Sequence, residues 1–106
     1  MRVPHELLRE TIIIQDFTGA GALGPVYSAD RSVRANVQAT NRLSTDAKGA
    51  QVTIDALVII RPESGPVRPE SRILWAGETY RVASSYAMPN TFRPSQWELQ
   101  IVRFVR

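Results

Sequence analysis

Apolar and polar residues alternate with a period of two along much of this chain, and this alternation most constrains its fold. In residues 31–39 the odd positions read Arg, Val, Ala, Val and Ala, whereas the even positions are all polar. Residues 51–60 repeat the pattern with five apolar residues on one side. These are Val52, Ile54, Ala56, Val58 and Ile60. Because successive side chains of a strand point to opposite faces, the pattern predicts two half-buried β-strands.

The second of these strands carries Leu57 and Ile59 on its other side. Apolar residues on both sides predict that this end of the strand is covered on both faces. The cover can come from a neighbouring subunit or from loops of the same chain, and the sequence favours neither.

Two further segments are predicted to be strands. Residues 11–17 are rich in β-branched side chains and form the first strand. Residues 95–106 begin with Trp97, Leu99 and Ile101 on one face, and the apolar phase then shifts at Ile101 and Val102. A phase shift of this kind indicates a bulge or a second buried contact.

Residues 72–82 are predicted to form a β-hairpin with Ala76 and Gly77 as its two-residue turn. With that turn, Trp75 pairs with Glu78 and Ile73 with Tyr80. The large apolar side chains of the hairpin then share one face, as cross-strand pairing favours. They are Ile73, Trp75, Tyr80 and Val82.

The remaining segments are expected to be connections. Residues 18–30 hold three glycines and residues 61–71 hold three prolines, so we expect a flexible loop and a segment that cannot be a central strand. Residues 41–50 are polar and lie between two strands. The best helix candidate is a single turn at residues 4–9, with Pro4 at a position that suits the first turn.

Together these elements predict an all-β fold, namely a small antiparallel β-barrel or sandwich of five to six strands with long loops. The length of 106 residues fits one domain over residues 1–106. The longest apolar run, residues 56–60, is far shorter than the roughly 20 residues that span a bilayer. Residues 1–10 lack the apolar stretch of a signal peptide, so we expect a soluble protein made inside the cell, with no membrane partner.

Charge and cysteine content exclude several kinds of site. Thirteen basic and ten acidic residues leave a net charge of +3 without any block of like charge, so no dedicated nucleic-acid or membrane face is indicated. The chain has no cysteine, which removes disulfides, thiolate metal sites and a cysteine nucleophile. His5 is the only histidine and lies near the terminus.

The carboxylates do not suggest an active site either. The pairs Glu6/Glu10 and Glu63/Glu70 lie in the terminus and the proline-rich segment, where no apolar pocket for a general acid is indicated. Asp46 has no companion acids at calcium-loop spacing. We therefore expect no enzymatic activity, no catalytic residue, no metal and no cofactor.

One motif matches a nucleotide-binding pattern literally. Gly19, Gly21 and Gly24 form G-x-G-x-x-G directly after a predicted strand. Dinucleotide binding requires a helix next, so that its N-terminus meets the pyrophosphate. Here an alternating strand follows, so the sequence context excludes that interpretation.

The aromatic residues Trp75, Tyr80 and Trp97 allow two interpretations. They could form a stacking platform like that of nucleic-acid-binding barrels, or they could pack in the core. All three fall on the predicted inward face of strands, which favours core packing.

In order along the chain, these elements resemble the head-to-tail stopper, or head-completion, proteins of long-tailed bacteriophages and related gene transfer particles. The resemblance covers roughly residues 7–105. One of its most specific parts is a W-x-G-x-x-Y-x-V hairpin, formed by Trp75, Gly77, Tyr80 and Val82. The other is a T-G-x-x-x-x-G-P-V-Y segment at residues 18–27.

The resemblance implies a small, non-enzymatic β-barrel of the virion neck. Such proteins form a homo-oligomeric ring, usually of twelve copies, between the portal and adaptor proteins on the head side and the tail proteins on the other. A loop between two strands projects into the channel and retains the packaged double-stranded DNA without reading its sequence. In this chain that loop corresponds to ten residues. They are Asn41, Arg42, Leu43, Ser44, Thr45, Asp46, Ala47, Lys48, Gly49 and Ala50.

The charge of residues 41–50 favours a steric plug over electrostatic holding, because Arg42, Lys48 and Asp46 are its only charged residues. We expect this loop to be mobile in the free protein, because only Leu43 could anchor it to a core. The competing functions are a tail terminator or other tail-side connector ring, a small nucleic-acid-binding β-barrel and, least in keeping with the residues, a small enzyme.

Overall fold

The computed structural model describes residues 10–89 and 94–103. The expected helical turn at residues 4–9 lies outside this range, as do His5, Glu6 and the last three residues of the final predicted strand. Eight strands and one short 3-10 helix, η2 (Pro62–Ser64), make up the described part. The strands are β1 (Glu10–Gln15), β2 (Phe17–Gly21), β3 (Gly24–Tyr27), β4 (Arg31–Thr45), β5 (Gln51–Ile60), β6 (Arg72–Trp75), β7 (Glu78–Pro89) and β8 (Pro94–Arg103).

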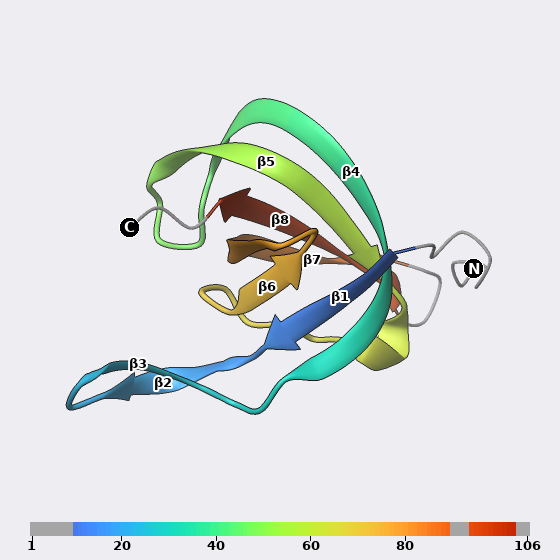
Figure 1. Cartoon of the computed structure of the whole chain (residues 1–106). Helices are drawn as coiled ribbons and strands as arrows, with labels where there is room; N and C mark the ends of the chain where they lie inside the picture. Colours follow the sequence, from blue (N-terminus) through green and yellow to red (C-terminus); the bar gives the residue numbers. More distant parts are fainter. Residues whose placement is uncertain (1–9, 90–93, 104–106) are drawn as a thin grey trace.

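Six of the strands form a closed antiparallel barrel in the order β1-β4-β5-β8-β7-β6 (Figure 1). The barrel closes where β1 pairs with β6, with Ile14 opposite Ile73. The prediction of an all-β fold is confirmed, and the architecture is a barrel rather than an open sandwich. Closure pairs every strand of the barrel on both sides over part of its length, and β4 and β5 extend beyond these pairings.

The interior of the barrel is filled by the residues whose alternation predicted the strands. Ile54, Ala56, Val58 and Ile60 of β5 are buried, whereas Leu57 and Ile59 on the opposite side are half-buried. The outer face at the end of β5 is therefore covered only in part. The main cluster contains thirteen buried residues. They are Ile12, Ile14, Val33, Ala35, Ala56, Val58, Ile60, Val67, Ile73, Tyr80, Val82, Leu99 and Ile101.

The β6–β7 hairpin has the predicted turn and register. Trp75 pairs with Glu78, and Ile73 pairs with Tyr80. Ala76 and Gly77 have φ values of 52° and 78°, as a type I′ turn requires. Trp75 and Trp97 pack half-buried against the main cluster and Tyr80 lies within it, so the core interpretation of these aromatic residues is confirmed.

A bulge accompanies the phase shift predicted near Ile101, but it lies on the partner strand. Val82 pairs with Ile101 and Ser84 with Gln100, so Ala83 of β7 is the extra residue. Val102 itself is half-buried. The bulge turns Ala83 and Ser84 into a buried region beside Gln100, which is also buried.

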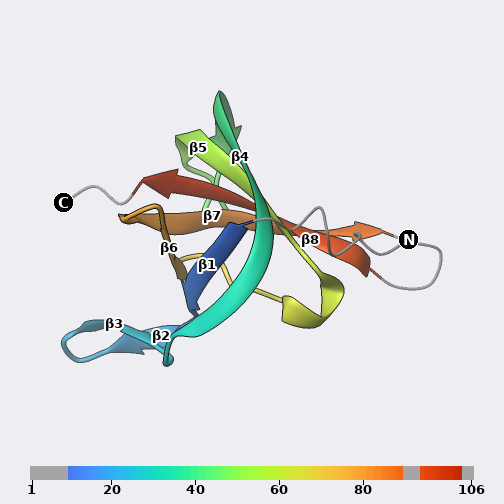
Figure 2. The same ribbon diagram turned by 45° about the vertical axis from the view of Figure 1, so that its right-hand side comes forward.

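The expectation of a flexible loop at residues 18–30 is wrong. β2 and β3 form a two-stranded antiparallel sheet of their own, and the predicted first strand divides into β1 and β2 around Asp16. This hairpin extends away from the barrel at the lower left of Figures 1 and 2. A β-strand, not a helix, follows the three glycines, which confirms that the nucleotide-binding context is missing.

The proline-rich residues 61–71 form no strand, as predicted, and cover one end of the barrel. Val67 reaches into the main cluster. Gly65 lies so close to Trp97 that a Cβ at this position would overlap the indole. Only glycine allows the segment to pass this close to the ring.

Candidate functional site

The residues selected from the sequence, 41–50, lie in two different kinds of structure. Residues 41–45 belong to β4, where Arg42 pairs with Ile54 and Thr45 with Gln51. Only residues 46–50 connect the strands. The expectation of a ten-residue loop is therefore wrong, because backbone pairing with β5 continues through Thr45. We call residues 46–50 the tip.

β4 and β5 are much longer than their contact with the rest of the barrel. β5 pairs with β8 only from Ala56 to Ile60, and beyond this point the two strands continue together as a curved ribbon over β8 (Figure 1). The register of β4 against β5 shifts between Ala39 and Arg42, and such irregularities bend a strand pair. We call residues 40–54, including the tip, the arch.

Polar and apolar side chains together fill the space beneath the arch. Ser44 Oγ and Ser84 Oγ both donate to Gln100 Oε1, at 3.0 and 2.9 Å. Ile54 and Ala83 are also buried but are not members of the main cluster. The arch therefore covers Gln100 and Ser84 of the β7–β8 pair, and it is held there by these hydrogen bonds together with the buried Ile54 side chain.

Asp46 holds the tip in a compact turn. Its Oδ1 accepts hydrogen bonds from the backbone N–H groups of Lys48 and Ala50, each at 2.9 Å. The Asp46 N–H donates to the Ala50 carbonyl and the Gly49 N–H to the Asp46 carbonyl, at 2.8 and 3.0 Å. Gly49 has a φ of 87°, a backbone conformation that glycine adopts without strain.

The tip is docked on the edge of β7. The Ala47 N–H donates to the Ala83 carbonyl at 3.0 Å, and Arg81 Nη1 lies 3.7 Å from Asp46 Oδ2. The same Arg81 nitrogen lies 2.9 Å from Glu70 Oε2, whose other oxygen is 3.9 Å from Lys48 Nζ. Four charges of alternating sign therefore connect the tip, β7 and the segment before β6.

This arrangement lowers the pKa of Asp46 below its ordinary value of 3.8. The largest cause is the hydrogen bond from the Ala50 N–H, which stabilises the carboxylate against the opposing effect of burial. The Lys48 N–H and the positive charges of Arg81 and Lys48 act in the same direction. The ionised form of Asp46 is thus the form that holds the tip.

The expectation that only Leu43 could anchor residues 41–50 is wrong. Leu43 is exposed, and the anchors are the polar contacts of Asp46 and Ala47 with β7. Arg81 and Glu70 were missed because nothing in the sequence links them to residue 46. For the turn of the tip, however, the sequence offers a signal in the spacing of Asp46 and Gly49, since Asp and Gly favour a tight turn with a local side-chain hydrogen bond.

Two cations of residues 41–50 face solvent. Arg42 is exposed on the arch, and the Lys48 side chain is 72% exposed. Among the described residues, no three His, Asp or Glu side chains gather as they would around a metal ion. No helix within the described ranges has the length and apolar character to cross a membrane.

Comparison with known proteins gives a structural match. No family model and no curated protein matches the sequence. Among solved structures, the fold is similar to that of the phage-like element PBSX protein xkdH from Bacillus subtilis, with a TM-score of 0.50 and 21% sequence identity. The alignment covers 89% of this chain and 92% of the xkdH chain. The chain therefore shares its fold, over most of its length, with a protein of a phage-like element.

Proposed function

We propose that this chain is a structural protein of a phage-type particle, a head-to-tail connector of the stopper kind. In this role, copies of the barrel form a ring between the portal and adaptor proteins and the tail. The ring closes the DNA channel and offers the surface on which the tail docks. The chain is a building block of the virion and needs neither a catalytic residue nor a cofactor.

The observation that carries this proposal is the arch. It extends the β4–β5 pair beyond the barrel by a bulged, curved ribbon and ends in a tip held by Asp46 and Arg81. Such an element can constrict a channel by its bulk when several copies surround one axis. The likeness to xkdH supports the proposal because this fold is similar, over most of the chain, to that of a phage-like element protein.

The charges of the arch favour a steric action on DNA. Arg42 and Lys48 are its exposed cations, so each copy engages few phosphates, and phosphate contacts carry no sequence information. The anchored tip further supports a rigid constriction rather than a swinging gate. Retention would therefore be independent of DNA sequence and only weakly dependent on salt.

The experiment that tests the function is to prepare particles without this chain. We expect the heads to fill with DNA, to join no tail and then to lose the DNA. Adding the purified protein should restore tail joining. Heads that keep their DNA while the tails are abnormal would assign the chain to the tail side, as a terminator. Normal particles would contradict any role in the neck.

A further inference from the structure

Glu70 stands at a backbone position where glycine is the usual residue. Residues 68–71 form a tight turn, in which the Arg68 carbonyl accepts the Ser71 N–H at 3.2 Å. Pro69 precedes Glu70, and Glu70 has a φ of 76°. A proline followed by a residue of positive φ is the pattern of a type II turn, which favours glycine at the second of these two positions.

The hydrogen bonds of this turn to β7 impose the same backbone requirement. The Val82 carbonyl accepts the Glu70 N–H at 2.8 Å, and the Val82 N–H donates to the Ser71 carbonyl at 2.9 Å. Two successive residues therefore oppose Val82, as in a β-bulge whose first residue has a left-handed conformation and is usually glycine. A glutamate in this conformation carries backbone strain, and such strain is typical of residues whose side chain has a task.

The turn is also anchored to the base of the β2–β3 hairpin. Ser71 is fully buried, and its Oγ accepts the Phe17 N–H at 2.9 Å. Arg68 Nη1 donates to the Phe17 carbonyl at 3.3 Å, and its guanidinium lies 5.3 Å from the centre of the Phe17 ring. Because the turn is held on both sides, the backbone of Glu70 is a fixed support.

The side chain of Glu70 reaches the two cations beside the tip. Glu70 Oε2 lies 2.9 Å from Arg81 Nη1, and Glu70 Oε1 lies 3.9 Å from Lys48 Nζ. The same Arg81 nitrogen lies 3.7 Å from Asp46 Oδ2. The side chains of Arg81 and Asp46 are only 24% and 6% exposed, so their charges are screened less by solvent than those of a surface pair.

We propose that Glu70 is a positioning residue for the tip, which it holds on β7 through Arg81 and Lys48. Without the Glu70 carboxylate, two cations remain beside the single carboxylate of Asp46, and the long Arg81 side chain loses its closest partner. The strained turn places this carboxylate on a rigid part of the barrel. The inference rests on the proposed function, in which the tip must keep one position to constrict the channel.

Amide hydrogen exchange in the pure protein tests this role at two reporter amides. The Ala47 N–H donates to the Ala83 carbonyl and reports the docking of the tip, whereas the Val82 N–H reports the turn at residues 68–71. The variants are Glu70→Gly and Glu70→Gln. Both remove the charge, but only glycine adopts the positive φ without strain.

We expect the Ala47 amide to exchange severalfold faster in both variants, while the Val82 amide keeps its protection. In denaturant unfolding, the Glu70→Gly variant should be more stable than the Glu70→Gln variant, because its backbone strain is relieved. A merely structural role would instead leave the tip protected in the more stable variant.

Two results would overturn the proposal. Unchanged exchange of the Ala47 amide in both variants would show that Arg81 holds the tip without Glu70. Equally accelerated exchange of the Ala47 and Val82 amides would show that Glu70 only supports its own turn.

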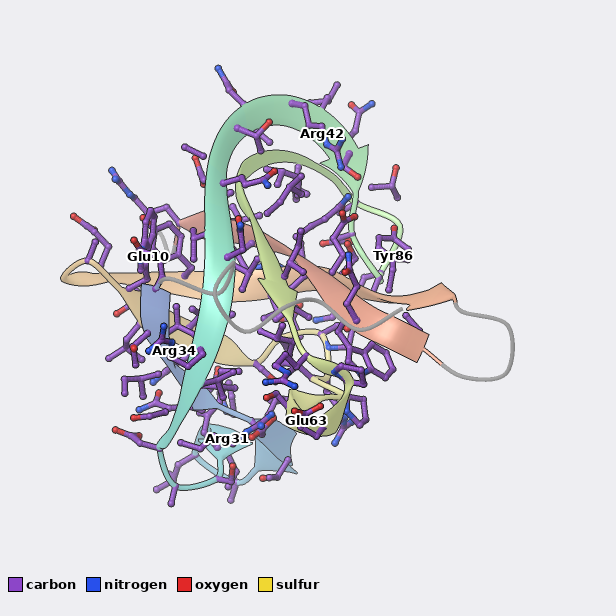
Figure 3. All side chains as sticks on the ribbon, turned by 90° about the vertical axis from the view of Figure 1, so that its right-hand side faces the viewer. Glu10, Arg31, Arg34, Arg42, Glu63 and Tyr86 are labelled. Atoms are coloured by element: carbon purple, nitrogen blue, oxygen red, sulfur yellow. The ribbon has the colours of Figure 1, made fainter. Side chains whose placement is uncertain are left out.

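The matched control is the Glu63→Gln variant, which changes another acid of the same proline-rich segment. Glu63 pairs with Arg61 at 3.1 Å. Figure 3 shows Glu63 toward the lower end of the molecule, whereas Arg42 on the arch lies at the upper end. We expect no change at the Ala47 amide. An acceleration as large as that of the Glu70→Gln variant would contradict a specific role of Glu70.

Particles carrying the Glu70→Gly variant connect this role to the proposed function. Their tail-less heads should lose more DNA than heads with the Glu63→Gln variant. If the Ala47 amide exchanges faster but the heads keep their DNA, Glu70 positions the tip and the tip does not close the channel. If the Ala47 amide is unchanged, the positioning role fails whatever the particles do, so the two failures are distinguishable.

Discussion

Asp46 carries more of the local structure of the tip than any other residue in it. Its carboxylate accepts two backbone N–H groups and faces Arg81, which is itself paired with Glu70. The lowered pKa of Asp46 means that the docked tip favours the ionised carboxylate over the protonated one. Because the pKa in the folded state is below 3.8, the stabilisation is fully present above that pH and is lost as the pH falls through the folded value.

We predict that the Asp46→Asn variant exchanges the Lys48 and Ala50 amide hydrogens severalfold faster than the wild type near pH 6. The amide oxygen still accepts, but the charge and its attraction to Arg81 are lost. The difference between the two proteins should shrink as the pH is lowered below 3.8, where the wild-type carboxylate takes up its proton. Equal exchange rates near pH 6 would show that Asp46 does not hold the tip.

The two tyrosines of β7 provide a matched test of the core. Tyr80 is 6% exposed and belongs to the main cluster, whereas Tyr86 is 47% exposed. We predict that Tyr80→Ala lowers the free energy of unfolding by about 3–5 kcal/mol, the usual cost of removing a buried aromatic side chain. Tyr86→Ala should change it by less than about 0.5 kcal/mol. Denaturant unfolding of both variants measures the difference, and similar losses would mean that Tyr80 is not a core residue.

Among the structural elements, the strands predicted best are those with one buried face. β5 has the predicted bounds, and the β6–β7 turn and register follow from Ala76 and Gly77, because in both cases burial or turn chemistry leaves a pattern in the residues. The β2–β3 hairpin was missed because glycine and proline disfavour strands in general, and its pairing has no buried face to reveal it. The outer half of β4 was missed because its bulge breaks the alternation and Asn41, Arg42 and Leu43 are all exposed.

The same reasoning limits what the sequence could predict of the candidate site. Residues 41–50 were selected through a family resemblance, and the turn-forming character of Asp46 and Gly49 is local enough to read from sequence. The docking of the tip depends on Arg81 and Glu70, which lie far away along the chain and meet Asp46 only after the barrel has closed. Contacts of this kind leave no periodic pattern.

The tip is the element whose removal should separate folding from function. Replacing residues 46–50 with a two-residue Asn-Gly turn should leave the barrel folded, because the main cluster contains no residue of the tip. Particles carrying this variant should join the ring to the head but leak DNA before tail attachment. Retention of DNA in tail-less heads measures the effect.

The matched control for this prediction removes the charges of the arch but keeps its bulk. The Arg42→Ala/Lys48→Ala variant should leak much less than the shortened variant, because few phosphates are engaged by each copy. If heads with the shortened tip retain their DNA as well as the wild type, the arch does not close the channel. If the charge variant leaks as much as the shortened one, the action is electrostatic rather than steric.

At the scale of the whole molecule, the β2–β3 hairpin and the arch extend from different parts of the closed barrel (Figure 1). In the proposed function, the arch with its tip is the element that constricts the channel. The fold is shared with the xkdH protein over most of both chains at only 21% identity.

The most direct test of the proposed function is the position of this chain in the particle. A cryo-electron microscopy map of the neck, with the barrel fitted as a rigid body, locates it without any variant. We predict a ring of barrels between the portal and adaptor on one side and the tail on the other, with the arches facing the axis. A map that places the chain at the tail side of the neck, elsewhere in the particle, or in no ring would contradict this account.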